Sequence, residues 1–208
     1  MATRANAISG PGKKRSREPY TVTMPSSVHA YRGELNEVEA LLPAIRAVVQ
    51  QEPEPWVQGW VAVIEGLVVS GRKGESEAAQ VLLDFTGPVL NRLFVYGGVI
   101  ALIECVRTLA RAGRLDEAAP FRARLAWLAT ASVPALAFLA WADGLLESDA
   151  RLLRVSIDRF GALGRPVELG RVLLDLGELT GDTEAATRGR EMLASCGATA
   201  FLREAAPA

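Results

Sequence analysis

Histidine and aromatic residues are scarce in this sequence of 208 residues. His29 is its only histidine, and aromatic side chains make up 6% of the chain. A single imidazole excludes a His-based metal cluster and a His-assisted serine triad within one chain. A GxxxxGK(S/T) phosphate-binding loop is also missing. Because no nucleophile–base pair, metal cluster or phosphate loop is visible, we expect no enzymatic activity, no bound metal and no cofactor.

Cysteines are few, and no apolar run has the character of a membrane span. Cys105 and Cys196 lie in predicted apolar helical runs without a Cys or His at metal spacing, so we expect two buried, reduced thiols. Residues 126–142 are uncharged, but this stretch falls short of the usual span and contains Ser132 and Pro134, which are typical of a helix start. No apolar segment follows the basic N-terminal residues, as a signal peptide requires. We therefore expect a cytoplasmic protein with no membrane contact.

A net positive charge is confined to the N-terminus. The first twenty residues carry +4, which leaves −5 for the rest of a chain whose total charge is −1. A mildly acidic body lacks the basic surface that neutralises phosphates, so the folded part is not expected to bind nucleic acid. We interpret residues 1–25 as a disordered basic tail and residues 26–208 as a single helical-repeat domain. The basic residues of the tail are Arg4, Lys13, Lys14, Arg15 and Arg17.

Helix-forming residues are abundant, and one kind of turn recurs along the chain. Half of the residues are hydrophobic, and alanine, leucine, arginine and glutamate dominate the composition. In each turn a glycine, suited to the left-handed end of one helix, precedes a residue suited to cap the next. The pattern predicts an all-α fold, a right-handed α-solenoid of about five helix-turn-helix, tetratricopeptide-like repeats. The turn glycines are Gly33, Gly74, Gly113, Gly144 and Gly181. The expected caps are Asn36, Ser76, Asp116, Ser148 and either Asp182 or Thr183.

The turns divide the chain into alternating first and second helices of antiparallel pairs. Gly164 followed by Pro166 is a clear stop and start between two units. Pro43 and Pro120 fall inside second helices, where proline removes a backbone hydrogen bond and favours a kink. The predicted first helices are residues 55–69, 88–112, 132–145 and 166–180. The predicted second helices are residues 35–50, 76–85, 115–130, 148–162 and 183–195.

Several short segments carry a family resemblance. They are residues 142–146 (ADGLL), 157–160 (IDRF), 163–169 (LGRPVEL), 173–177 (LLDLG) and the pair Gly181-Asp182. Over roughly residues 28–205 the pattern resembles the tetratricopeptide-like helical-repeat region of large LuxR-type ATP-binding transcription regulators and related actinobacterial cyclase–ATPase fusions. The resemblance implies a superhelix that receives an inducer or a protein partner. No ATPase or DNA-binding residue carries over, because those motifs are missing here.

Four carboxylates interrupt the apolar pattern of the predicted first helices, which usually line the concave side of such arrays. They are Glu65, Glu104, Asp143 and Asp175. One interpretation is an acidic groove that binds a partner or ligand. The favoured alternative is a salt-bridged face, in which arginines on the same class of helices neutralise the carboxylates. Those arginines are Arg92, Arg107 and Arg171.

Trp56 and Trp60 are a further candidate pair. They lie one helical turn apart on one face of a predicted helix. Two indoles so placed can anchor a ligand or a protein partner. Packing at the first junction between repeats is the favoured alternative.

The sequence favours a non-catalytic helical-repeat module that mediates protein–protein interaction, as a scaffold in bacterial regulation or signalling. The alternative is a small-molecule effector-sensing domain of a transcription regulator or cyclase-type protein. Only residues 26–32 precede the first turn glycine, so we interpret the first repeat as lacking most of its leading helix and the chain as truncated at both ends. An apolar edge left there is expected to bind a partner or cause self-association.

Overall fold

The computed structural model describes residues 26–51, 54–93 and 96–203, and within these ranges the chain is helical with no strand. The predicted N-terminal tail lies outside the described residues. Residues 26–31 form a short helical segment. The elements that follow are α2 (Leu35–Gln51), α3 (Pro55–Lys73), α4 (Glu75–Thr86), the 3-10 helix η1 (Gly87–Arg92), α5 (Tyr96–Arg111), α6 (Leu115–Ala129), α7 (Val133–Leu146), α8 (Ala150–Ala162), α9 (Pro166–Thr180), α10 (Thr183–Ser195) and α11 (Ala200–Arg203).

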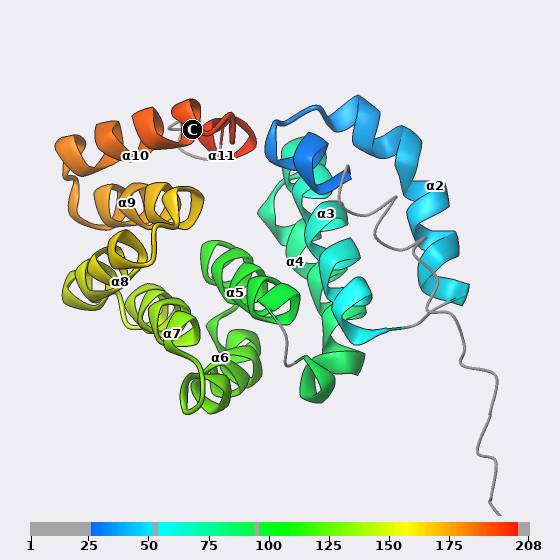
Figure 1. Ribbon diagram of the computed structural model, residues 1–208, viewed down its shortest axis with the longest axis horizontal. Coiled ribbons are helices and arrows are strands. Elements are labelled where there is room, and N and C mark those ends of the chain that lie inside the picture. Colours follow the sequence, from blue (N-terminus) through cyan, green and yellow to red (C-terminus); the bar gives the residue numbers. More distant parts are fainter. Residues whose placement is uncertain (1–25, 52–53, 94–95, 204–208) are drawn as a thin grey trace, which may run out of the picture.

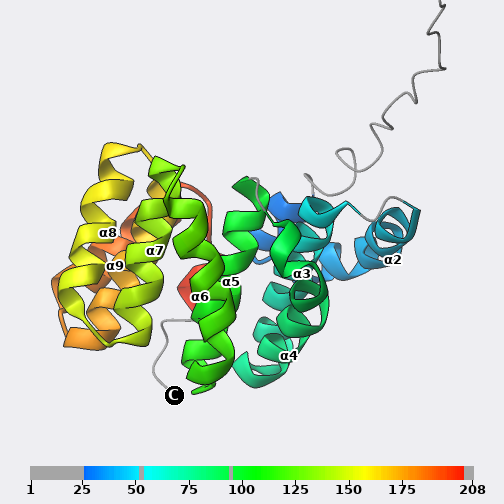
Figure 2. The ribbon, with the colours of Figure 1, turned by 90° about the horizontal axis from the view of Figure 1, so that it is seen from below.

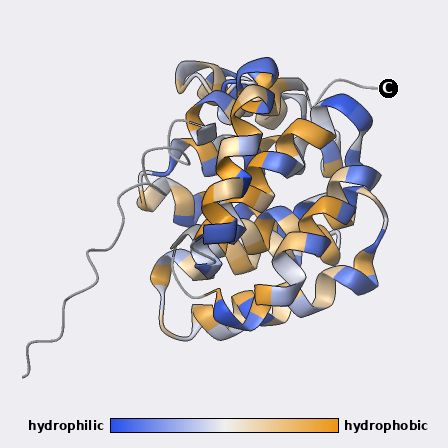
Figure 3. Ribbon diagram, turned by 90° about the vertical axis from the view of Figure 1, so that its right-hand side faces the viewer, coloured by the Kyte–Doolittle hydropathy of each residue, from blue (hydrophilic) through white to orange (hydrophobic). Residues whose placement is uncertain are grey.

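Consecutive helices pack as antiparallel pairs, and the pairs stack on one another. α3 packs with α4, α5 with α6, α7 with α8 and α9 with α10, while α4, α6 and α8 each also contact the first helix of the next pair (Figures 1 and 2). This arrangement confirms the predicted all-α helical-repeat solenoid. Hydrophobic and hydrophilic residues alternate in bands along the helices (Figure 3), as helices with one buried face require.

The turn between α9 and α10 shows how the repeat pattern produces a helix pair. Gly181 ends α9 in the left-handed conformation, with φ of 72°, which glycine adopts without steric cost. The Asp182 carboxylate then accepts the backbone N–H groups of Glu184 and Ala185, both at 3.0 Å, and so caps α10. Inside the pair, a Cβ added at Gly177 would lie 2.7 Å from the Ala186 Cβ. Small residues at these two positions therefore allow the close approach of α9 and α10.

Other turns differ from the predicted pattern of glycine and cap. Asn36, Ser76 and Asp116 lie inside α2, α4 and α6, so they do not cap these helices. In the turn after α7 the left-handed residue is Ser148, with φ of 52°, and Asp149 caps α8 by accepting the Arg151 N–H at 2.8 Å. Gly144 lies inside α7 instead.

The predicted helix over residues 88–112 is wrong as a single element. The chain forms η1, then Leu93 takes an extended conformation (φ −80°, ψ 106°), and α5 begins at Tyr96. Extension at Leu93 lets its side chain fold back against α5, where a Cβ added at Gly98 would lie 3.0 Å from the Leu93 Cβ. The side chain of Leu93 is buried, and its carbonyl accepts a 3.1 Å hydrogen bond from Arg124 Nε. Burial and this long-range contact outweigh the local helical pattern.

α7 forms the centre of the main hydrophobic core. Trp141, Phe138 and Phe160 are fully buried and meet edge to face, with ring centroids 4.9 Å apart for the two phenylalanines and 6.1 Å apart for Trp141 and Phe160. Burial by α6, α8 and α5 explains why residues 135–142 of α7 are uncharged. Among the described residues, no helix combines the length and the hydropathy needed to cross a membrane.

The helical array curls until its two ends meet, as Figure 1 shows for α11 and the helical segment before α2. Thr199 Oγ1 donates a 2.5 Å hydrogen bond to the Arg32 carbonyl. Tyr31 and Phe201 pack edge to face at 5.1 Å. We call these four residues the ring closure. The sequence did not predict α11 or this contact.

The apolar residues at the start of the array pack inward on α3. Ala30, Leu35 and Val38 are buried against Ile64 and Val68 of α3. Val28, in the helical segment before α2, stays 49% exposed, and binding of a partner or a second copy at this end remains a prediction.

The two cysteines differ in their surroundings. Cys105 is fully buried in α5, as predicted, whereas Cys196 is exposed. Cys196 occupies the C-cap position of α10, where the helix ends at the surface. The predicted burial of Cys196 is therefore wrong.

Candidate functional site

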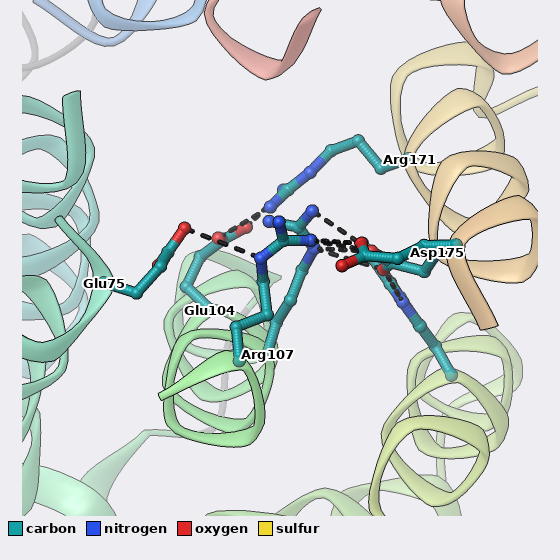
Figure 4. Close-up of polar contacts among 8 residues, drawn as sticks. Glu75, Glu104, Arg107, Arg171 and Asp175 are labelled. Carbon is teal, nitrogen blue, oxygen red and sulfur yellow. Dashed lines mark hydrogen bonds and ion pairs between the residues drawn. The ribbon is translucent and has the colours of Figure 1, made fainter. Parts of the chain in front are cut away.

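Asp175 of α9 is the centre of a buried polar cluster inside the array (Figure 4). Arg107 of α5 binds its carboxylate in a forked manner, with Nε–Oδ2 and Nη2–Oδ1 distances of 3.1 Å. Trp141 Nε1 of α7 donates to Oδ2 at 2.7 Å. Asp175 and Arg107 are only 4% and 2% exposed. One carboxylate thus connects three helices from three successive pairs.

A second buried ion pair lies beside the first. Arg171 of α9 donates from both terminal nitrogens to the Glu104 carboxylate of α5, and the Nη2–Oε2 distance is 2.8 Å. The Arg171 guanidinium also lies 4.0 Å from the Phe201 ring centroid and 5.3 Å from that of Trp141. Both charged side chains are almost fully buried. Cation–π contact stabilises a buried guanidinium, so Arg171 links the interior to the ring closure.

Arg111 extends this cluster toward the surface. Its Nη1 donates to Glu178 Oε2 at 2.7 Å and lies 3.7 Å from Asp175 Oδ1. Its Nε lies 3.6 Å from Glu75 Oε1 at the start of α4. We call this connected set the interior network. Its members are Glu75, Glu104, Arg107, Arg111, Trp141, Arg171, Asp175 and Glu178.

The remaining two predicted carboxylates pair with arginines that the sequence analysis did not single out. Glu65 accepts hydrogen bonds from Arg46 of α2 at 2.8 and 2.9 Å. Asp143 accepts hydrogen bonds from Arg122 of α6 at 2.7 and 3.2 Å. In each pair the carboxylate's hydrogen bond raises the pKa of the arginine above its ordinary value. Thus all four predicted carboxylates have arginine partners.

The structure therefore has the salt-bridged arrangement and not an open acidic groove. Arg107 and Arg171 make the pairs expected of them, while Arg92 lies exposed at the end of η1. The sequence signal was the position of the carboxylates on first helices. It did not identify Arg46, Arg111 or Arg122, because each of these arginines pairs with a carboxylate on another helix, and such contacts depend on how the helices pack.

Trp56 and Trp60 both contribute to packing. Trp56 is half-buried against Ile45, Val57 and Val61 at the contact of α2 with α3. Trp60 is also half-buried, on the main hydrophobic core. Both indoles pack against other side chains, as the favoured alternative predicts, and neither is among the exposed large hydrophobic residues.

A cavity of about 230 Å³ lies next to the ring closure, and we call it the closure cavity. Its walls come from both ends of the array, because α11 supplies one residue and the start of α2 and the end of α3 supply others. Glu75 is the one charged residue in its lining, and Ser70 supplies a hydroxyl. The lining residues are Gly33, Leu35, Leu67, Ser70, Gly71, Gly74, Glu75 and Ala200.

A second feature that sequence analysis missed lies on the outer surface at the turn from α6 to α7. Trp127 is 58% exposed and Val133 is 68% exposed. The Arg124 guanidinium lies 4.1 Å from the Trp127 ring centroid. One turn beyond Val133, the carbonyl of Leu136 accepts a 2.7 Å hydrogen bond from Arg159. We call Arg124, Trp127, Val133 and Arg159 the Trp127 surface.

The described part of the chain contains no group of three or more His, Cys, Asp or Glu side chains arranged to hold a metal ion. Comparison with known proteins gives no further guide to the site, since no family model, no curated protein and no solved structure matches this chain.

Proposed function

We propose that this chain is a non-catalytic helical-repeat module that binds another protein through the Trp127 surface. The observation that carries the proposal is a pair of exposed apolar side chains, Trp127 at the end of α6 and Val133 at the start of α7, on either side of the turn at residues 130–132. Large apolar side chains gathered on a surface mark interaction sites. Tryptophan and arginine are also the residue types that contribute most to binding energy at protein interfaces.

The interior of the array is a poor alternative for partner binding. Glu104, Arg107, Arg171 and Asp175 are each at most 4% exposed, and all four take part in the interior network. A peptide on the concave side would have to separate these pairs, and leaving a buried charge unpaired costs several kcal/mol, roughly 3–5. The outer surface requires no such rearrangement.

The charges near Trp127 indicate the chemistry of the partner. Arg124 lies over the Trp127 ring, and Arg159 donates a hydrogen bond to the Leu136 carbonyl one helical turn after Val133. A complementary partner would offer an apolar segment with acidic neighbours, because complementary charge raises the association rate and fixes orientation. The family resemblance in sequence supports a place in bacterial regulation or signalling, and the scarcity of cysteine supports a cytoplasmic location.

A second candidate function is the sensing of a small-molecule effector. The observation in its favour is the closure cavity, since its walls come from the two ends of the array. A ligand bound there would contact both ends and stabilise the curled form over any opened form.

The experiment for the proposed function is native mass spectrometry on the tagged full chain recovered gently from its own host. We expect a stoichiometric protein partner with the natural sequence and its loss with Trp127→Ala. Leu115→Ala is the matched control, because Leu115 is 47% exposed at the opposite end of the same helix. A partner that remains with Trp127→Ala, or a bare monomer throughout, would contradict binding at this surface.

A further inference from the structure

We propose that the closure cavity binds a small organic cation, a primary amine carried on a compact apolar body. This inference rests on the second candidate function, to which it adds a ligand class, and it is independent of protein binding at the Trp127 surface. Three observations carry it. They are the chemistry of the cavity walls, their origin in both ends of the array, and the link from Glu75 to the interior network.

The cavity walls match a molecule with one charged end. Leu35, Leu67 and Ala200 supply apolar surface, and Glu75 is the one ionisable side chain in the lining. Ser70 Oγ donates to Glu75 Oε1 at 3.3 Å, so a hydroxyl and a carboxylate lie together on one wall. An ammonium group supplies three donors, whereas a carboxylate can accept about four hydrogen bonds. A cation with an apolar body therefore suits these walls better than an anion.

The volume of the cavity limits the size of the ligand. At about 230 Å³ it exceeds an engineered cavity of roughly 150 Å³ that holds benzene, so a ligand of about six to ten non-hydrogen atoms fits. Metabolite-sized amines fall in this range, whereas nucleotides are excluded by size. The cavity is open on one side, where Gly71 is exposed, so a ligand can enter from solvent.

The position of the cavity connects ligand binding with the shape of the array. Gly33 and Leu35 belong to the N-terminal end, and Ala200 begins α11 at the C-terminal end. Thr199, the residue before Ala200, donates to the Arg32 carbonyl, directly before Gly33. A ligand in the cavity thus contacts both sides of the ring closure, and its binding favours the closed form.

Glu75 also relates the cavity to the buried charges. Arg111 Nε lies 3.6 Å from Glu75 Oε1, while another nitrogen of Arg111 binds Glu178 at 2.7 Å. Figure 4 shows Glu75 facing the buried arginines from the α4 side. An ammonium group beside Glu75 would compete with Arg111 for that carboxylate and shift Arg111 toward Asp175 and Glu178. Binding of a ligand in the cavity would therefore change the ion pairs of the interior network.

The test uses the purified full chain and three probes of similar size: cyclohexylmethylamine, cyclohexylmethanol and cyclohexanecarboxylate. Binding is followed by amide chemical shifts in two-dimensional NMR. We expect the amine to shift the amides of Gly33, Ser70, Gly71, Gly74 and Ala200 in a saturable way. We expect it to bind at least tenfold more tightly than either other probe. Equal binding of the alcohol, preferential binding of the carboxylate, or shifts confined to other residues would overturn the inference.

Two variants separate the charge of the site from its shape. Glu75→Gln should weaken amine binding at least tenfold, whereas Glu77→Gln, on an exposed residue of the same helix, should leave it unchanged. Ala200→Val adds volume to the cavity wall and should weaken the amine and the alcohol alike, which tests the location even where Glu75→Gln unfolds the chain. An unchanged affinity in Ala200→Val would place the amine elsewhere. Failure of every probe to bind would overturn the inference but would leave protein binding at the Trp127 surface untouched, so the two proposals fail separately.

Discussion

Trp141 Nε1 donates a 2.7 Å hydrogen bond to Asp175 Oδ2. Through this bond α7, the most apolar of the described helices, stabilises a buried carboxylate on α9. Both residues are buried, and Arg107 from a third helix completes the contact. A buried carboxylate without partners would be strongly destabilising. The order of α5, α7 and α9 around Asp175 is therefore part of what determines how the array curls.

Asp175→Asn should destabilise the protein severely. The change removes the negative charge and leaves Arg107 buried beside a neutral amide, at a cost of about 3–5 kcal/mol in the free energy of unfolding. Urea unfolding followed by circular dichroism measures this cost. The matched control is Asp143→Asn, because its partner Arg122 is 41% exposed, and partly exposed pairs contribute roughly 1 kcal/mol or less. Similar losses for the two variants would contradict the central role of Asp175.

Phe201→Ala should open the ring closure selectively. The change removes the edge-to-face contact with Tyr31 and the ring beneath the Arg171 guanidinium. Truncation of a buried phenylalanine costs about 3–5 kcal/mol, and we expect the loss to appear first as faster amide hydrogen exchange in residues 26–36. Phe121→Ala is the control, since Phe121 is buried in the main core away from the ends. If both variants accelerate exchange in residues 26–36 to the same degree relative to the rest of the chain, the ends are not held by Phe201.

The two cysteines should react at very different rates. Burial raises the pKa of the Cys105 thiol to about 12, and the negative charge of the neighbouring Glu104 acts in the same direction. The thiolate is the reactive form, so Cys105 should resist a disulfide reagent at neutral pH while Cys196, which is exposed, reacts. We expect one thiol per native chain, two after unfolding, and none in native Cys196→Ala. Rapid reaction of both thiols in the native protein would contradict the burial of α5.

Asp149 gives a pH dependence at the start of α8. The side chain of Arg151 and then its backbone N–H hold the pKa of Asp149 at about 2, compared with about 3.9 in an unfolded chain. Because the folded pKa is the lower one, the contribution of Asp149 to stability is present above about pH 4 and is lost as the pH falls through about 2. The stability difference between the natural chain and Asp149→Asn should shrink over that window. Asp158→Asn, on the exposed side of the same helix, provides the control, and a difference that stays constant down to pH 2 would contradict the assignment.

The sequence predicted the helices best where turn chemistry is local. Pro166 starts α9, Gly181 ends it and Asp182 caps α10, and these boundaries agree with the structure. The same reasoning failed at Leu93, because the extended conformation there depends on contacts with Gly98 and Arg124 from other elements. Local patterns describe a residue's neighbours along the chain and do not describe contacts made by the curl of the array.

For the candidate site too, sequence reasoning succeeded where a residue's place on its own helix decides and failed where contacts between distant elements decide. The positions of Glu104 and Asp175 on first helices indicated a charged interior, and the pairing with Arg107 and Arg171 was weighed as the favoured alternative. The sequence could not indicate that Arg171 would also contact Phe201, because α11 and the ring closure were not predicted. Trp127 was missed because its exposure depends on the orientation of α6, a helix with a weak separation of polar and apolar faces.

The affinity of the purified protein partner for the Trp127→Ala variant tests the central claim most directly. Isothermal titration calorimetry measures this affinity together with the affinities for the natural chain and for Leu115→Ala. A tryptophan at the centre of an interface contributes at least about 2 kcal/mol, so Trp127→Ala should weaken binding roughly 30-fold or more while Leu115→Ala stays within about threefold. An affinity for Trp127→Ala equal to that of the natural chain would show that the partner binds elsewhere and would contradict the account.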